Sequence, residues 1–193
     1  MSSSNGILST LAEILRTALG SNRASRTSAP RRPTARLRTE PHISAASSQD
    51  DAGRGAGTAT RRIDPDRIGA LQIEYSPDRD GAPDAGEIIW TWVPYEENDG
   101  RGKDRPVLVI GRESADRVYA VRMTSKPHDG DRDYLSIGTG AWDSQGRESW
   151  VDVEQLYSVH ERGMRREAAV LARVRYDRVA AALTRRYGWR AAG

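Results

Sequence analysis

The fold is indicated most clearly by the stretch "GRGKDRPVLVIG", residues 100–111, in which a glycine-rich basic loop runs into apolar β-branched residues. The run "VLVI" is typical of a buried strand. Pro106 restricts the residues before it to extended backbone geometry, which fixes the direction of the Arg105 side chain. We therefore expect Arg105 to lie at the mouth of a buried strand.

The loop in this stretch does not match a nucleotide-binding P-loop. A P-loop needs a glycine five residues before the Gly-Lys pair and a serine or threonine after it. Here Glu97 takes the place of that glycine, Asp104 follows Lys103, and a strand stands where a helix is required. ATP or GTP binding by that route is excluded. Two interpretations of Arg105 remain: it binds a phosphate, or it pairs with Asp104, Glu96 or Glu97 at the end of the strand.

Further short strands with hairpin-length links flank this stretch. They are "EIIWTWV" before it and "RVYAVRMT", "YLSIG" and "SWVDVEQLYSV" after it, and the last segment, "ARVRYDRVAAALTRRYGW", has apolar residues at helical spacing. No alternation of strands and helices is visible, which disfavours a doubly wound nucleotide-binding fold. The sequence predicts a mostly β protein, a small antiparallel barrel or strongly bent sheet with a C-terminal helix.

The first 85 residues have a different composition. Residues 1–20 predict an amphipathic helix, and residues 21–60, rich in Ser, Ala, Arg, Pro and Gly, predict a disordered linker. Residues 61–85 are expected to be an extension that packs on the barrel or leads into it. They include a turn of helix after Asp64 and a short strand near residues 70–75. Residues 86–193 form the predicted barrel domain.

Composition and charge limit the possible functions only loosely. The net charge is +3, but seven arginines and no acidic residue lie between Glu13 and Glu40, so the basicity belongs to the tail. The chain has no cysteine, which excludes disulfides and thiolate chemistry. No apolar run is long enough to span a membrane and no secretory signal is apparent, so a cytoplasmic location is expected.

A second candidate segment is "MTSKPHDGDRD", residues 123–133. Thr124 and Ser125 end a predicted strand, and Lys126 and His128 follow in a polar loop. Phosphodiester cleavage without a metal needs a base, a cation and an acid, and these side chains could supply them. The alternative is that His128 is a solvated loop residue and that Thr124 only bonds to the backbone at a strand end.

The order "GEIIWTWVP", "GKDRPVLVI", "VYAVRMTS", followed by "VDVEQLYSV" and a terminal helix, resembles the PemK/MazF family of toxins from type II toxin–antitoxin systems. The resemblance covers residues 86–189. It implies an SH3-like barrel that dimerises and cleaves single-stranded RNA without a metal or another cofactor. It also implies a catalytic role for Arg105 and Thr124, with Ser125 beside them.

Two functions are therefore considered. The first is a metal-independent endoribonuclease in which Arg101, Lys103, Lys126 and His128 bind RNA. The alternative is a catalytically inactive barrel that binds nucleic acid or a protein partner, because the acidic "YEEND" loop would repel a phosphate backbone. The expected partners are single-stranded RNA, a cognate antitoxin and a second copy of the chain. DNA is expected only through an antitoxin complex, and membrane contact of the N-terminal helix is not favoured.

Overall fold

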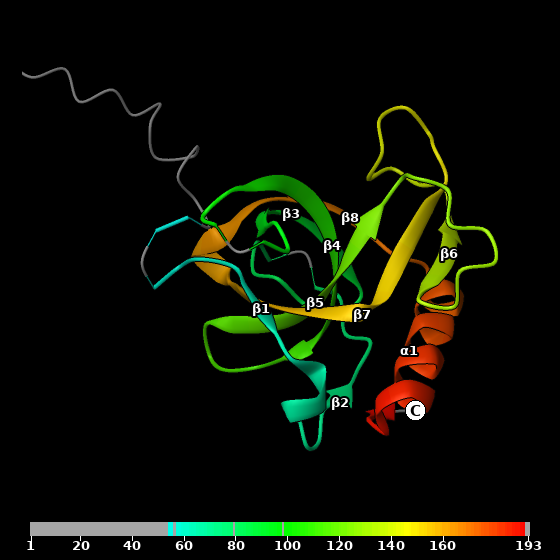
Figure 1. The fold of residues 1–193 in the computed structure, drawn as a ribbon, viewed down its shortest axis with the longest axis horizontal. Helices are drawn as coiled ribbons and strands as arrows, with labels where there is room; N and C mark the ends of the chain where they lie inside the picture. Colours follow the sequence, from blue (N-terminus) through cyan, green and yellow to red (C-terminus); the bar gives the residue numbers. More distant parts are fainter. Residues whose placement is uncertain (1–53, 56, 79, 98, 192–193) are drawn as a thin grey trace, which may run out of the picture. The chain divides into compact units, whose positions relative to one another are not determined.

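The computed structural model describes residues 54–55, 57–78, 80–97 and 99–191 (Figure 1). The predicted helix at 1–20 and most of the predicted linker at 21–60 lie outside the described residues. The described elements are β1 (Arg61–Ile63), η1 (Pro65–Arg67), β2 (Gln72–Ile73), β3 (Glu87–Pro94), β4 (Gly102–Arg112), β5 (Arg117–Thr124), β6 (Tyr134–Gly138), β7 (Ser149–His160), η2 (Glu161–Gly163), β8 (Met164–Val170), α1 (Arg173–Tyr187) and β9 (Arg190–Ala191).

Seven of the strands form one antiparallel sheet in the order β1-β7-β5-β4-β3-β8, and β6 pairs with another part of β7. Strands β2 and β9 form a separate parallel pair. The register shifts within β3–β8, β4–β5, β5–β7 and β6–β7, and such bulges increase the twist and bend of a sheet. The predicted fold class, mostly β and antiparallel with a C-terminal helix, is confirmed.

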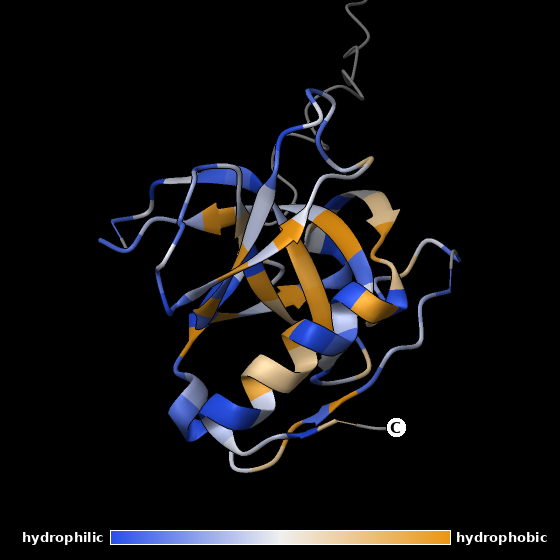
Figure 2. Ribbon diagram, turned by 90° about the vertical axis from the view of Figure 1, so that its right-hand side faces the viewer, coloured by the Kyte–Doolittle hydropathy of each residue, from blue (hydrophilic) through white to orange (hydrophobic). Residues whose placement is uncertain are grey.

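The central strands are buried on both faces, which explains why they read as continuous apolar runs in the sequence. On one face, Leu108 and Ile110 of β4 belong to a core cluster that includes Tyr176 and Leu183 of α1. On the other face, Val107 packs in a second cluster with residues of β3, β5 and β7. Figure 2 shows hydrophobic colouring on the central strands and hydrophilic colouring on the loops. Helix α1 thus covers one face of the sheet, and the second cluster fills the middle of the other face.

Helix α1 forms as the sequence predicts. Its apolar residues at helical spacing, Tyr176, Val179, Ala180 and Leu183, are buried. The helix ends at Gly188, which adopts the left-handed conformation (φ 73°) that suits a glycine C-cap. Within the described residues, no helix is long and apolar enough to cross a membrane.

Two features of the sheet differ from the sequence-based expectation. Strand β8 was not predicted, because its charged residues interrupt the apolar alternation, and its pairing with β3 orders it instead. Strand β4 begins at Gly102, so Lys103 lies on the strand and not in the loop. Gly102 packs so closely on Trp92 that an added Cβ would come within 2.5 Å of that ring.

The extension before β3 contributes to the sheet. The predicted turn of helix after Asp64 and the short predicted strand are confirmed as η1 and β2. Strand β1 pairs with β7, and residues 57–60, at the end of the predicted linker, lie against the sheet. They do so because the buried Arg117 guanidinium needs acceptors and donates to the carbonyl oxygens of Gly57 and Ala59.

Candidate active site

Arg105 and Thr124 lie on the neighbouring strands β4 and β5. The last recorded pair at this end of the antiparallel ladder is Val107 with Arg122, and continuing the register by two residues brings Arg105 opposite Thr124. Because side chains alternate along a strand, these four residues share one face of the sheet. Arg105 and Thr124 are both half-buried. The fold therefore brings together the two residues to which the family resemblance gives catalytic roles.

The Arg105 side chain forms no ion pair with Asp104, Glu96 or Glu97, the partners considered from the sequence. Asp104 forms an ion pair with Arg165, at 2.9 Å, and Glu96 accepts a hydrogen bond from Gln155. Among the described residues, no hydrogen bond or ion pair holds the Arg105 guanidinium. Its donors therefore remain available to an anion on this face.

The hydroxyl groups lie where β5 ends. Thr124 pairs with Trp150 of β7, and its Oγ1 accepts a hydrogen bond of 3.1 Å from the backbone N–H of Lys126. This is the backbone bond considered in the sequence analysis. A threonine hydroxyl can donate one hydrogen bond while it accepts others, so its donor remains available to a phosphate oxygen. Ser125, which follows directly, is half-buried.

The predicted basic residues surround this pair unequally. Lys103 is exposed and lies two residues before Arg105 on β4, hence on the same face. Lys126 is exposed in the loop after β5. Arg101 instead forms an ion pair of 2.6 Å with Asp99. Lys103 and Lys126 therefore flank the Arg105–Thr124 pair, whereas the charge of Arg101 is balanced within its own loop.

His128 is not a freely solvated residue. Its ring stacks on that of Tyr134, with centroids 3.5 Å apart and planes 9° from parallel, and its Nδ1 lies 3.4 Å from Asp131 Oδ2. The Tyr134 hydroxyl accepts a hydrogen bond from Arg122 Nη2 at 3.2 Å. His128 is thereby linked through Tyr134 to the strand that carries Thr124.

Arg122 is a residue of this face that the sequence analysis missed. Its Nη2 donates to Asp152 Oδ2 at 2.7 Å, and the Asp152 side chain is only 2% exposed. Burial acts to lower the pKa of Arg122, but Tyr157, Asp152 and Tyr134 act in the opposite direction and leave the pKa raised. The guanidinium therefore stays charged. The sequence did contain a signal for it: Arg122 precedes Thr124 by two residues in a predicted strand, and residues at that spacing share one face.

A chain of hydrogen bonds crosses the same face to the β3–β4 loop. The Tyr157 hydroxyl donates to Gln155 Oε1 at 2.7 Å, and Gln155 Nε2 donates to Glu96 Oε1 at 2.8 Å. Arg122 Nη1 lies 3.8 Å from the same Glu96 oxygen. The hydrogen bond from Gln155, with the charges of Arg122 and Arg62, lowers the pKa of Glu96 although partial burial opposes the shift. Glu96 is thus held on this face as a carboxylate.

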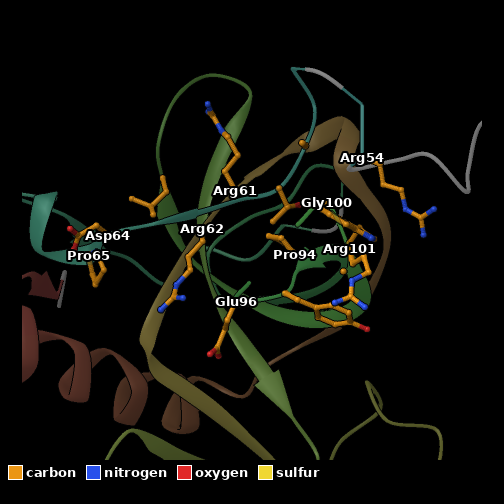
Figure 3. Close-up of a pocket in the computed structure, with 15 residues that line it drawn as sticks. Arg54, Arg61, Arg62, Asp64, Pro65, Pro94, Glu96, Gly100 and Arg101 are labelled. Atoms are coloured by element: carbon orange, nitrogen blue, oxygen red, sulfur yellow. The ribbon is translucent and has the colours of Figure 1, made fainter. Parts of the chain in front are cut away.

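A cleft of about 1230 Å³ lies between β1 and the β3–β4 loop, which contributes Glu96 (Figure 3). Its other polar and aromatic lining side chains include Arg54, Arg61, Arg62, Asp64, Trp92, Tyr95 and Arg101. In Figure 3, Arg62 and Glu96 extend in the same direction, whereas Arg61 points the opposite way. The cleft is therefore mainly cationic, with an aromatic wall.

A bent antiparallel sheet with one terminal helix, carrying an arginine and a hydroxyl on the face that the helix does not cover, is the arrangement that the PemK/MazF resemblance implies. The model of the PemK-like, MazF-like toxins of type II toxin–antitoxin systems matches residues 84–186, more than half of the chain. The chain belongs to this family. Strand β1 and the arginines of residues 54–62 precede the matched region.

Several solved structures are similar to the chain at low identity. An endoribonuclease in complex with its cognate antitoxin from a mycobacterial species is 14% identical, with 55% of this chain and 96% of that chain covered and a TM-score of 0.45. MazE–MazF from Deinococcus radiodurans is 21% identical, with 55% of this chain and 96% of that chain covered and a TM-score of 0.44. The Mycobacterium tuberculosis toxin MazF-mt6 is 15% identical, with 53% of this chain and 97% of that chain covered and a TM-score of 0.40. No curated protein matches the sequence.

Proposed function

We propose that this protein is a metal-independent endoribonuclease that cleaves single-stranded RNA and acts as the toxin of a toxin–antitoxin pair. The observation that carries the proposal is the register of β4 and β5, which supports a pair formed by Thr124 and Arg105, whose guanidinium has no partner among the described residues. The family match supports the toxin class. An arginine beside a hydroxyl suits a phosphate group, since both donate hydrogen bonds to its oxygens.

In the proposed reaction, the 2′-oxygen of one nucleotide attacks the adjacent phosphorus while the bond from phosphorus to the 5′-oxygen breaks. The products are a 2′,3′-cyclic phosphate and a free 5′-hydroxyl. Arg105 donates two hydrogen bonds to the non-bridging oxygens, where negative charge develops. Thr124 and Ser125 orient the phosphate or the 2′-hydroxyl.

Two proton transfers accompany this reaction, one from the 2′-hydroxyl and one to the leaving 5′-oxygen. His128 is the proposed proton carrier, because Tyr134 connects it to the strand that holds Thr124. Lys103 and Lys126, on either side of the pair, contact neighbouring phosphates in this proposal. Single strands are the proposed substrate because their nucleotides can be splayed apart to align the 2′-oxygen with the bond that breaks.

The proposed protein partners follow from the family description, a toxin of a toxin–antitoxin system. They are a cognate antitoxin and a second copy of the chain, with DNA contacted only through an antitoxin complex. Size-exclusion chromatography with light scattering tests the dimer. Co-expression with the product of the neighbouring open reading frame tests the antitoxin: a cognate antitoxin co-purifies and suppresses cleavage.

The activity is tested by incubating the full chain with mixed single-stranded RNA in EDTA. We expect discrete fragments whose 3′ ends carry a 2′,3′-cyclic phosphate, identified by mass spectrometry. Retention of RNA without cleavage would overturn the proposal and favour the inactive binding module. Cleavage that appears only after a divalent cation is added back would overturn the metal-independent mechanism.

A further inference from the structure

The carboxylate of Glu96 occupies a place suited to a phosphate oxygen. It accepts a hydrogen bond of 2.8 Å from the Gln155 amide, lies 3.8 Å from the Arg122 guanidinium and is stabilised by the positive charge of Arg62. Amide and guanidinium donors are the groups that also bind phosphate in proteins. Glu96 comes from the β3–β4 loop, and its side chain is 59% exposed, so this anion is held at the surface and can be exchanged.

This place lies beside the proposed scissile phosphate. Arg122 precedes Thr124 by two residues on β5 and shares its face, so the two side chains begin about 7 Å apart along the strand. That separation is comparable to the spacing of successive phosphates along an extended single strand. A strand with one phosphate on Arg105 and Thr124 would therefore bring a neighbouring phosphate to Arg122 and Gln155.

The adjoining cleft has the chemistry for the continuing strand. Within the described part of the chain, the side chains of Arg54 and Arg62 form no hydrogen bond or ion pair, whereas the acidic Asp64 is already paired with Arg67 at 3.4 Å. Tyr95 contributes an aromatic ring, a surface on which a base can stack. Arg62 belongs to β1, which pairs with β7 at Tyr157 and lies outside the matched residues 84–186.

We infer that the cleft between β1 and the β3–β4 loop binds the RNA strand next to the cleaved bond. One backbone phosphate takes the place of the Glu96 carboxylate between Arg62, Arg122 and Gln155, and the exposed Glu96 side chain turns away to admit it. The identity of the ligand rests on the proposed function. Glu96 thus competes with RNA, and Arg62, supplied by the extension, attracts it.

The role of Arg62 is tested by binding alone. The full chain is titrated into a fluorescent 2′-O-methyl RNA oligonucleotide, which lacks the attacking hydroxyl, and the affinity is measured by anisotropy over a range of salt concentrations. We expect Arg62→Ala to weaken binding about fivefold. The slope of the logarithm of the binding constant against the logarithm of the salt concentration should become shallower by about 0.7, the value for one lost phosphate contact on a single strand. Arg62→Lys retains the slope. Arg178→Ala, which removes an exposed charge from α1, is the matched control and binds like the wild type.

The role of Glu96 predicts the opposite change. Glu96→Ala is expected to tighten binding of the same oligonucleotide about fivefold, because it removes the competing anion. Glu97→Ala removes an exposed carboxylate from the same loop and is the matched control. Circular dichroism confirms that each variant is folded. If Arg62→Ala behaves like Arg178→Ala, or Glu96→Ala like Glu97→Ala, the inference is wrong. Because the oligonucleotide cannot be cleaved, the result does not depend on the catalytic assignment.

Discussion

The two ends of the β4–β5 hairpin use arginine in different ways. At the end where β4 leads into β5, Arg117 is 8% exposed and donates to Ser158, Gly57 and Ala59, and Arg112 pairs with Asp84 at 2.7 Å. At the opposite end Arg105 is half-buried, and no hydrogen bond or ion pair among the described residues engages its guanidinium.

The difference separates structural arginines from one kept available for a ligand. A buried guanidinium that donates to acceptors inside the protein stabilises the fold, because burying it unpaired would be costly. A guanidinium held on a rigid strand beside a hydroxyl, with free donors, is prepared for an external anion. Substitutions at the two ends should therefore act on different properties, with Arg105 affecting cleavage and Arg117 affecting stability.

The largest expected effect is that of Arg105→Ala on RNA cleavage. We expect the cleavage rate to fall by about 10²–10³, the usual consequence of removing one donor that stabilises transition-state charge. The matched control is Arg112→Ala, which removes an arginine from the other end of β4 and should retain most of the activity. The rate is measured on a labelled oligonucleotide in EDTA. Unchanged cleavage by Arg105→Ala would remove this residue from the mechanism.

Arg117→Ala should act on stability instead. It leaves the buried Ser158 and the backbone carbonyls of Gly57 and Ala59 without their donor, which costs about 2–4 kcal/mol in the free energy of unfolding. Urea unfolding followed by tryptophan fluorescence measures the loss. Cleavage per folded molecule should stay near the wild-type value. An unchanged urea midpoint would show that this end of the hairpin is not held by Arg117.

Thr124→Val removes a hydroxyl while keeping the shape of the side chain. We expect cleavage to fall by about tenfold to a hundredfold, because one hydrogen bond to the phosphate or the 2′-hydroxyl is lost. Thr124→Ser retains the hydroxyl and should keep most of the activity. If the two variants cleave equally, the hydroxyl is not used and the Lys126 backbone contact is its only role.

Interactions between residues close in sequence could be predicted for this hairpin, and those between residues far apart in sequence could not. The strands containing Arg105 and Thr124 are predictable, because their apolar runs and the restriction by Pro106 are local. The contact between Glu96 and Gln155 is not predictable, since it joins residues 59 positions apart. A bulge in β7 between its pairings at Val151 and Leu156 also resets the side-chain alternation there. For that reason Asp152 and Gln155 both reach the site.

The smallest expected effect is the contribution of Glu96 to stability. Its pKa in the folded protein is lowered, chiefly by the hydrogen bond from Gln155 and further by Arg122 and Arg62. A lowered folded-state pKa adds stability that is complete above the ordinary glutamate value and is lost as the pH falls through the lower one. Since the side chain is 59% exposed, the contribution should be below about 1 kcal/mol.

Comparing the wild type with Glu96→Gln isolates this contribution, because glutamine keeps an acceptor for Gln155 but cannot ionise. The wild type should be slightly more stable at neutral pH, and the difference should shrink in acid, as measured by thermal unfolding across the acid range. High salt should shrink it as well, since the charges of Arg122 and Arg62 supply part of it. A difference that grows towards low pH would contradict the contact. Glu96 would then not be the anion that occupies this face in the absence of RNA.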